Sequence, residues 1–211
     1  YGLNLQLAKF PAQFMSETLF TFLQTGGVWL LLRGVAGSLT NGVQGEHSEP
    51  PQKGRSSLLL FAGAGSLLGL ATLTRPVILL FPGVAAAWLV LRSEKEWKRA
   101  LPSVGVMLGA FVLCLIPWMV RNKSVLEKFV VVSTVGGQTF FHSNHSTSNG
   151  TWVPLEIPAE AKGLTEPERD AYYYRQGFEF IFSHPLTSLK NSIKKVLRLY
   201  YVFYPEYDWY F

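Results

Sequence analysis

The sequence predicts an all-α integral membrane helical bundle of several spans, followed by an outward-facing loop segment of mixed structure and by amphipathic helices. The 211-residue chain is 48% hydrophobic and has a mean hydropathy of +0.19. Only 16% of its residues are charged, against about 25% in an average soluble domain. The apolar residues also form long runs, and a run of about 17–25 such residues can cross a bilayer as one helix.

The apolar runs carry almost no charge, which excludes a soluble helical core, because such a core needs polar outer helix faces. The run 56–91 has Arg75 as its one charged residue, the run 17–32 has Glu17, and the run 101–120 has none. The sequence therefore predicts four spans, at about 18–32, 58–73, 77–91 and 101–120.

Each predicted span has a boundary signal. Ser16 and Glu17 suit the start of the first helix, and a loop rich in Gly, Ser, Pro and Gln follows at 33–57. The second span ends at Thr74-Arg75-Pro76, because the residue before a proline is disfavoured in helical geometry. The charged stretch RSEKEWKRA separates the third span from the fourth.

Lysine and arginine counts in the short loops set the expected orientation. The loops at 33–57 and 92–100 are basic and are predicted to be cytoplasmic, so the Arg75 turn and the chain after 120 face outward. The net charge of +5 comes from basic residues at the ends of apolar runs rather than from one patch. No nucleic-acid partner is therefore predicted.

The chain is expected to contain a transmembrane bundle fragment, an extracytoplasmic loop segment, and an interfacial helix or the start of a further span: 1–131, 132–185 and 186–211. The stretch EKFVVVSTVGG at 127–137 indicates a short strand ending in a glycine turn. Thr165 and Glu168 have the spacing of a capping box and predict a helix start. After Pro185, leucine and isoleucine recur on one face of a predicted helix and lysines on the other. This pattern is typical of a helix that lies at a membrane surface.

Arg75 and Arg121 are the candidate ligand-binding residues. Both are expected at the outer ends of spans, where a guanidinium fork suits a phosphate group. The alternative is that each is an independent anchor that reaches toward the lipid headgroups. Asn122 follows Arg121 in IPWMVRN. Glu17 is the one carboxylate near an outer span entrance, and a plain helix-start role is its alternative.

Three histidines have the residue type of metal ligands: His142, His145 and His184. No acidic or cysteine ligand stands beside them, so no metal site is predicted. The single cysteine, Cys114, lies inside the fourth span and is interpreted as a packing residue.

The ordered motifs LTRP, PW..RN and VST.GG resemble those of the bacterial polyprenyl-phosphate-sugar glycosyltransferases, the protein-mannosyltransferase-like or ArnT-like branch of the GT-C superfamily. The resemblance covers nearly the whole chain. It implies a GT-C-like, multi-pass enzyme of the bacterial inner membrane. Such an enzyme moves a sugar from a polyprenyl-phosphate donor to a glycan, lipid or protein acceptor on the extracytoplasmic side. Arg75 and Arg121 would then contact the donor phosphate, with Asn122 beside them.

The resemblance also places the catalytic carboxylate in an early outer loop upstream of Tyr1, so the chain is interpreted as an internal fragment without its base. Asn144 in HSNHSTSNG matches a turn that relatives build from GNNP, but His145 and Ser146 stand here in place of the second asparagine and the proline. No cofactor is expected, the lipid-phosphate-linked sugar being the donor substrate. Two alternatives stay open: a transporter or flippase for a lipid-linked or anionic substrate, and a non-catalytic membrane scaffold.

Overall fold

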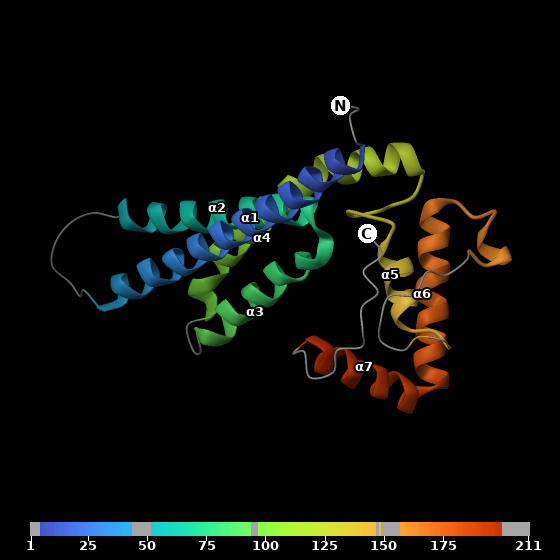
Figure 1. Cartoon of the computed structure of the whole chain (residues 1–211). Helices are drawn as coiled ribbons and strands as arrows, with labels where there is room; N and C mark the ends of the chain where they lie inside the picture. Colours follow the sequence, from blue (N-terminus) through green and yellow to red (C-terminus); the bar gives the residue numbers. More distant parts are fainter. Residues whose placement is uncertain (1–4, 44–51, 94–96, 147, 149–156, 200–211) are drawn as a thin grey trace. The chain divides into compact units, whose positions relative to one another are not determined.

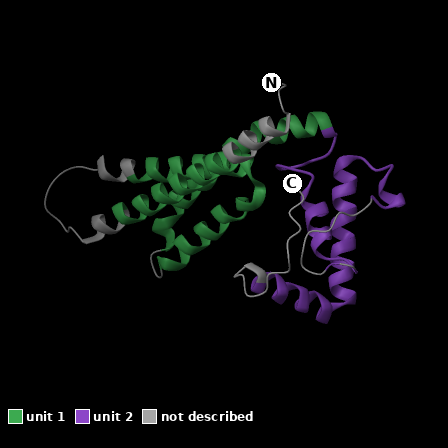
Figure 2. Cartoon of the chain, in the orientation of Figure 1, with its two compact units in different colours: residues 1–125 green, residues 126–211 purple. Residues whose placement is uncertain are grey.

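The computed structural model describes residues 5–43, 52–93, 97–146, 148 and 157–199. In these residues the chain is helical and falls into two compact units, 1–125 and 126–211 (Figures 1 and 2). The first unit contains the following elements: α1 (Leu5–Val43), α2 (Gln52–Thr74), the 3-10 turn η1 (Pro76–Ile78), α3 (Phe81–Arg92) and most of α4 (Trp97–Leu126). The predicted boundaries at 131 and 185 separate membrane segments from extracytoplasmic ones. The compact units do not test that distinction, so the boundaries stay a prediction.

Among the described residues, three helices are long and apolar enough to cross a membrane: Ser16–Gly37 within α1, Ser57–Thr74 within α2, and α4. This result indicates membrane association. The expected span at 77–91 is a shorter apolar helix, because η1 takes its first residues and α3 has 12 residues. A helix of that length reaches about 18 Å, whereas a bilayer core is about 30 Å thick.

The helices α1 and α2 are longer than the sequence predicts. Helix α1 begins at Leu5 and ends at Val43, so Ser16 and Glu17 lie inside it and do not start it. The predicted loop at 33–57 is helical at 33–43 and 52–57, and residues 44–51 lie outside the described residues. Packing explains the difference: Gly34 lies against the Phe61 ring, and the Ser57 hydroxyl donates to the Gly34 carbonyl at 3.4 Å.

Glycines set the close packing in the first unit. A Cβ atom added to Gly65 would overlap the carbonyl oxygen of Met107, and one added to Gly69 would lie 2.7 Å from Cβ of Cys114. The later glycine of α2 meets the later residue of α4, so α2 and α4 run parallel. The spacing of Gly65 and Gly69 is the small-xxx-small pattern that lets membrane helices approach closely, and Cys114 is a packing residue there.

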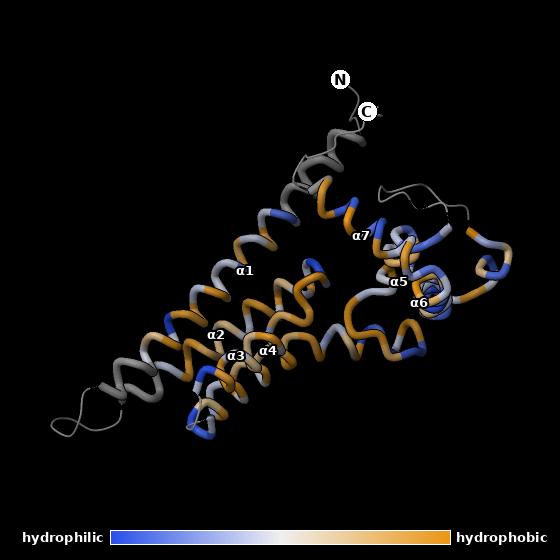
Figure 3. Tube along the Cα trace, turned by 90° about the horizontal axis from the view of Figure 1, so that it is seen from below, coloured by the Kyte–Doolittle hydropathy of each residue, from blue (hydrophilic) through white to orange (hydrophobic). Residues whose placement is uncertain are grey.

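The interior of the first unit holds apolar side chains such as Phe61 and Met107 together with small residues, and its exterior is apolar as well. Thr72 is fully buried, and its hydroxyl donates to the Leu68 carbonyl at 2.8 Å. Large apolar side chains point outward on every helix, and orange dominates α2, α3 and α4 in Figure 3. Examples are Phe22, Leu59, Val84 and Leu113. A surface of this kind is suited to lipid rather than to water.

The break between α2 and α3 lies where the sequence predicts it. Arg75 has an extended backbone, with φ −143° and ψ 116°, and Pro76 opens η1. The Arg75 N–H still closes the last turn of α2 by donating to Ala71, at 2.8 Å. Helix α3 then returns along the bundle, where Ala85, Ala86 and Leu89 join the common core with residues of α1, α2 and α4.

The second unit contains α5 (Gly136–Ser143), the 3-10 turn η3 (Ala159–Ala161), α6 (Glu166–Ser183) and α7 (Pro185–Leu199). Its core is aromatic: the Phe140 ring lies 5.5 Å from that of Tyr174 and 4.7 Å from that of Phe178, and Phe141 stacks on Tyr173. The helices α5 and α6 therefore form one packed pair.

The strand predicted at 127–137 is wrong: the described residues contain no strand. Side chains of this segment instead bind the start of α6. Lys128 forms an ion pair with Glu168, and the Thr134 hydroxyl donates to Glu166. The glycines begin α5 rather than ending a strand, because the Gly137 N–H donates to the Asp170 carboxylate at 2.6 Å.

The helix start predicted at Thr165 is confirmed. Glu168 accepts hydrogen bonds from the Thr165 N–H at 3.1 Å and from the Thr165 hydroxyl at 2.8 Å, within a capping box. These bonds and the Lys128 ammonium favour the ionised carboxylate, so they hold the pKa of Glu168 below its usual value.

The contact between α2 and α4 can be tested with one added methyl group. We expect Gly65→Ala to destabilise the protein by about 1–3 kcal/mol, because the methyl group meets backbone that can yield only if α4 moves. The matched control is Gly109→Ala on α4, where a Cβ meets nothing within 4 Å; there the change should stabilise the helix by about 0.5–1 kcal/mol. Chemical unfolding in detergent micelles measures both, and equal effects would contradict this packing.

Candidate functional site

The structure joins two of the predicted site residues. The Arg75 guanidinium donates from Nη2 to Oε1 of Glu17 at 2.8 Å, across 58 residues of sequence. Both side chains are about half exposed, at 46% for Arg75 and 57% for Glu17. Glu17 lies in the fourth turn of α1, and Arg75 follows the last residue of α2. The antiparallel packing of α1 on α2 brings them to one end of the bundle.

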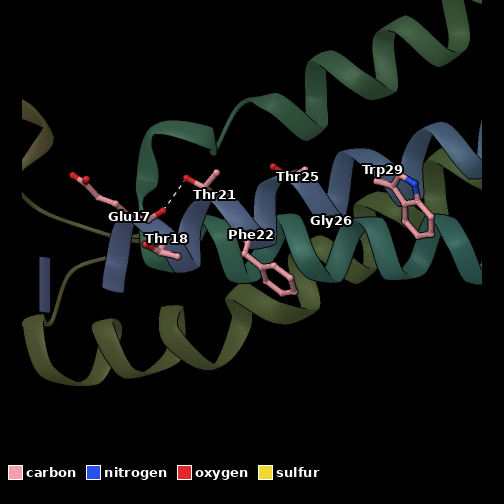
Figure 4. A pocket seen from close by; sticks show the side chains of 7 residues that line it. All are labelled: Glu17, Thr18, Thr21, Phe22, Thr25, Gly26 and Trp29. Atoms are coloured by element: carbon pink, nitrogen blue, oxygen red, sulfur yellow. Dashed lines mark hydrogen bonds between the residues drawn. The ribbon is translucent and has the colours of Figure 1, made fainter. Parts of the chain in front are cut away.

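A groove runs along α1 from this ion pair (Figure 4). It is open to the outside of the bundle, has a volume of about 690 Å³, and begins at Glu17 and ends at Trp29. Its lining alternates hydroxyl and aromatic side chains at helical spacing: Thr18, Thr21, Phe22 and Thr25 lie between the ends, together with Gly26. At 1.5 Å per residue the groove extends for about 18 Å.

One of the hydroxyl groups that line the groove already forms a hydrogen bond within α1. The Thr21 hydroxyl donates to the Glu17 carbonyl at 2.8 Å, as Figure 4 shows. Gly26 opens space where a side chain would stand, and a Cβ there would lie 3.2 Å from Leu67. The remaining walls are the exposed rings of Phe22 and Trp29. The groove thus offers an apolar track that leads to a charged pair.

Arg121 and Asn122 form a second, local pair. The Arg121 guanidinium donates to the Asn122 side-chain oxygen at 3.2 Å and lies over the Trp118 ring, 5.0 Å from its centroid. Asn122 is buried, at 2% exposed. Because α2 and α4 run parallel from the level of Gly69 and Cys114, Arg121 lies at the same end of the bundle as Arg75.

The arrangement of Arg121 on Trp118 recurs at the other end of the bundle. There Arg33 lies over Trp29 and Arg92 lies over Trp88, at 5.0 and 5.3 Å from the ring centroids. Tryptophan and arginine are typical of the interface between lipid and water. The geometry of Arg121 is therefore that of an interfacial anchor. Arg75 differs: it contacts the Glu17 carboxylate, and in the described part of the chain its guanidinium lies over no tryptophan ring.

The predicted residues after 126 belong to the second unit. Asn144 follows the last residue of α5, and its side-chain amide donates to the Phe140 carbonyl at 2.9 Å, so it caps the end of that helix. His142 and His145 are both buried near one another. His184 instead ends α6, where it stacks on Phe180. No group of three metal-ligating side chains occurs in the described part of the chain.

Sequence reasoning missed the groove and the Glu17–Arg75 pair. The signal for the groove is present in α1, where Thr18, Phe22, Thr25 and Trp29 recur at intervals of four, three and four residues, which places them on one helix face. The ion pair has no local signal, because it depends on how α1 packs against α2.

Comparisons with known proteins give no match to any family model, curated protein or solved structure. The resemblance to the GT-C glycosyltransferases therefore rests on the motifs alone.

The strength of the Glu17–Arg75 pair can be measured with a double-mutant cycle. Because both groups are half exposed and screened by solvent, we expect a coupling free energy of about 0.2–1 kcal/mol between Glu17→Gln and Arg75→Gln, from unfolding in detergent micelles. A weak pair is one that a ligand phosphate could replace. A coupling several times larger would show instead that the pair locks α1 to α2.

The second unit should lose stability in mild acid through His145. Burial and the nearby His142 both disfavour the charged imidazole, so they lower the pKa of His145 from 6.5. The unfolded chain then takes up a proton first, so this stabilisation is complete above pH 6.5 and is lost as the pH falls through the lower folded pKa. Thermal unfolding between about pH 8 and about pH 5 measures the loss.

The matched variants for this pH experiment are His145→Gln and His184→Gln. The first removes the buried titrating group and should flatten the profile below pH 6.5. The second removes an exposed imidazole and should leave the profile unchanged. An identical acid response in the wild type and in His145→Gln would contradict the assignment.

Proposed function

We propose that the chain is part of a membrane glycosyltransferase that moves a sugar from a polyprenyl-phosphate donor to an acceptor on the extracytoplasmic side. The observation that carries the proposal is the Glu17–Arg75 pair at the mouth of the groove on α1. The three membrane-capable helices and the motif resemblance support it. On this proposal the protein is a multi-pass protein of the bacterial inner membrane.

The groove suits a lipid-linked phosphate in both of its parts. An isoprenoid chain is apolar and flexible and can lie along the exposed rings of Phe22 and Trp29. Its phosphate would then lie near Arg75. Within the part of the chain that the structure describes, that guanidinium donates one hydrogen bond, from Nη2 to Glu17, while an arginine has five N–H donors in a planar fork. Several donors therefore remain for phosphate oxygens.

The chemistry requires positive charge at this point. During transfer the bond between the sugar anomeric carbon and the phosphate oxygen breaks, and the acceptor oxygen or nitrogen forms a new bond to that carbon. Negative charge develops on the departing phosphate, and a fixed guanidinium stabilises it most where water is excluded. The acceptor proton passes to a carboxylate base, as the resemblance implies.

The two arginines have different parts in this proposal. Arg75 contacts the phosphate, and Glu17 positions the guanidinium through the 2.8 Å bond. Arg121 holds the end of α4 at the membrane interface through Trp118 and Asn122. It contributes positive potential at the same end of the bundle rather than a direct contact.

Activity of the full-length protein in membranes tests this assignment. We expect Arg75→Ala to lower the rate of sugar transfer from a polyprenyl-phosphate donor by about a hundredfold, the loss typical of one donor that stabilises a developing oxyanion. Arg121→Ala should lower it less. The matched control is Arg92→Ala, which removes the same side chain, also stacked on a tryptophan, from the opposite end of the bundle.

The control should keep full activity, and all three variants should be present in the membrane fraction in equal amounts. Equal losses in Arg75→Ala and Arg92→Ala would contradict a role for Arg75 at the donor phosphate. Movement of the lipid across the bilayer with no cleavage of the sugar–phosphate bond would show a transporter in place of a transferase.

A further inference from the structure

Helix α7 is amphipathic, and it packs against its own unit with its polar face. The Asn191 side-chain amide donates to the Ser148 carbonyl at 2.9 Å, and the Lys195 ammonium donates to the Ser143 carbonyl at 3.0 Å. Ser188 is buried on the same side. Burial also lowers the pKa of Lys195, which agrees with a lysine held against the protein.

The opposite face of α7 is apolar and exposed. Its large side chains recur at helical spacing, and their exposed fractions are 81% for Leu186, 59% for Leu189, 51% for Ile193 and 56% for Val196. Phe182, at the end of α6, is also strongly exposed. Orange and blue alternate along α7 in Figure 3. A water-soluble unit would place these two faces the other way round, so an apolar phase must cover the outer face.

The charge of α7 indicates what this phase is. The helix PLTSLKNSIKKVLRL contains three lysines and an arginine and has no acidic residue. Lys190 and Lys194 are exposed, and Lys190 lies at the edge of the apolar face. Basic residues beside an inserted apolar face are typical of helices that lie on anionic lipid.

As described, from Pro185 to Leu199, α7 is not among the helices that could cross a membrane. Its 15 described residues reach about 22 Å, less than the roughly 30 Å of a bilayer core. The described part of the chain also has three helices able to cross a membrane, so a bilayer is a surface that this protein meets.

We propose that α7 is a membrane-surface anchor of the second unit, with its leucine, isoleucine and valine face inserted below the headgroups of an anionic bilayer and Lys190 and Lys194 at the phosphates. The sequence left two alternatives for the residues after 185, an interfacial helix and the start of a span. For the residues up to Leu199, this proposal selects the interfacial helix. It does not depend on the glycosyltransferase proposal.

Single spin labels on the reconstituted full chain test the proposal. Cys114 is the one cysteine in the sequence, so Cys114→Ala gives a background for Leu189→Cys, Ile193→Cys and the matched control Thr187→Cys, an exposed position on the polar side of α7. Leu113→Cys, on the exposed apolar surface of α4, reports correct insertion. Collision rates with oxygen, which concentrates in lipid, and with a water-soluble nickel chelate give the depth of each label.

In vesicles of phosphatidylcholine and phosphatidylglycerol we expect oxygen to dominate at 189 and 193 and the chelate to dominate at 187. Chelate dominance at all three positions, with Leu113→Cys still in lipid, would overturn the proposal. Low collision rates with both reagents at 189 and 193 would also overturn it, because a second copy of the chain or another protein surface would then cover the face.

The lysines are tested in the same system. Lys190→Gln with Lys194→Gln should move the label at 189 toward water in vesicles that contain phosphatidylglycerol. In vesicles of phosphatidylcholine alone, the same pair of changes should have little effect. An equal shift in both lipids, or no shift in either, would overturn the assignment to an anionic surface. These measurements do not use sugar transfer, so their failure is distinct from a failure of the proposed function.

Discussion

The missing N–H of Pro76 sets the geometry of one end of the first unit. Because Pro76 cannot donate and disfavours helical geometry in the residue before it, α2 ends at Thr74 and Arg75 has an extended backbone. The chain then turns through η1 into α3, and this return allows α4 to run parallel to α2. Arg75 therefore leaves its helix where α1 presents Glu17. If α2 continued through residue 76, Arg75 would lie on the helix surface and its direction would follow the helix period instead.

Each unit of the protein exposes apolar surface that a soluble domain would bury. In the first unit, large apolar side chains lie on the outside as well as in the core. In the second unit, α7 buries Ser188 and Asn191 and exposes its aliphatic face. Water would oppose both arrangements, at about 25 cal/mol for each Å² of exposed apolar surface. Lipid removes that cost, because a hydrocarbon chain is as apolar as a leucine side chain. One apolar solvent therefore accounts for features of two units that pack separately.

Local signals gave the sequence prediction its successes. The end of α2 before Pro76, the Thr165–Glu168 capping box and the amphipathic pattern of α7 each depend on a few neighbouring residues. The errors arose where packing decides. Helix α1 continues through Gly34 because Phe61 packs there, and the valine-rich stretch after Lys128 forms no strand because its side chains bind the start of α6. The same contrast between local signals and packing applies to the site residues. Arg75 could be identified as unusual from sequence, but its partner Glu17 could not, since the two residues are 58 positions apart in the sequence.

The ion pair between Arg75 and Glu17 bears on how an anion could bind at this end of the bundle. A phosphate beside Arg75 would also stand near the Glu17 carboxylate, and two like charges about 4 Å apart repel by about 4 kcal/mol near a protein surface. Both side chains are about half exposed, so Glu17 has room to turn toward water when an anion arrives. The carboxylate would then orient the guanidinium while the groove is empty and would give up its place to the phosphate. A buried pair could not make that exchange, because it would leave an unpaired charge away from water. The partial exposure of the pair, which makes it weak as a stabilising contact, is thus the property that a phosphate site at Arg75 requires.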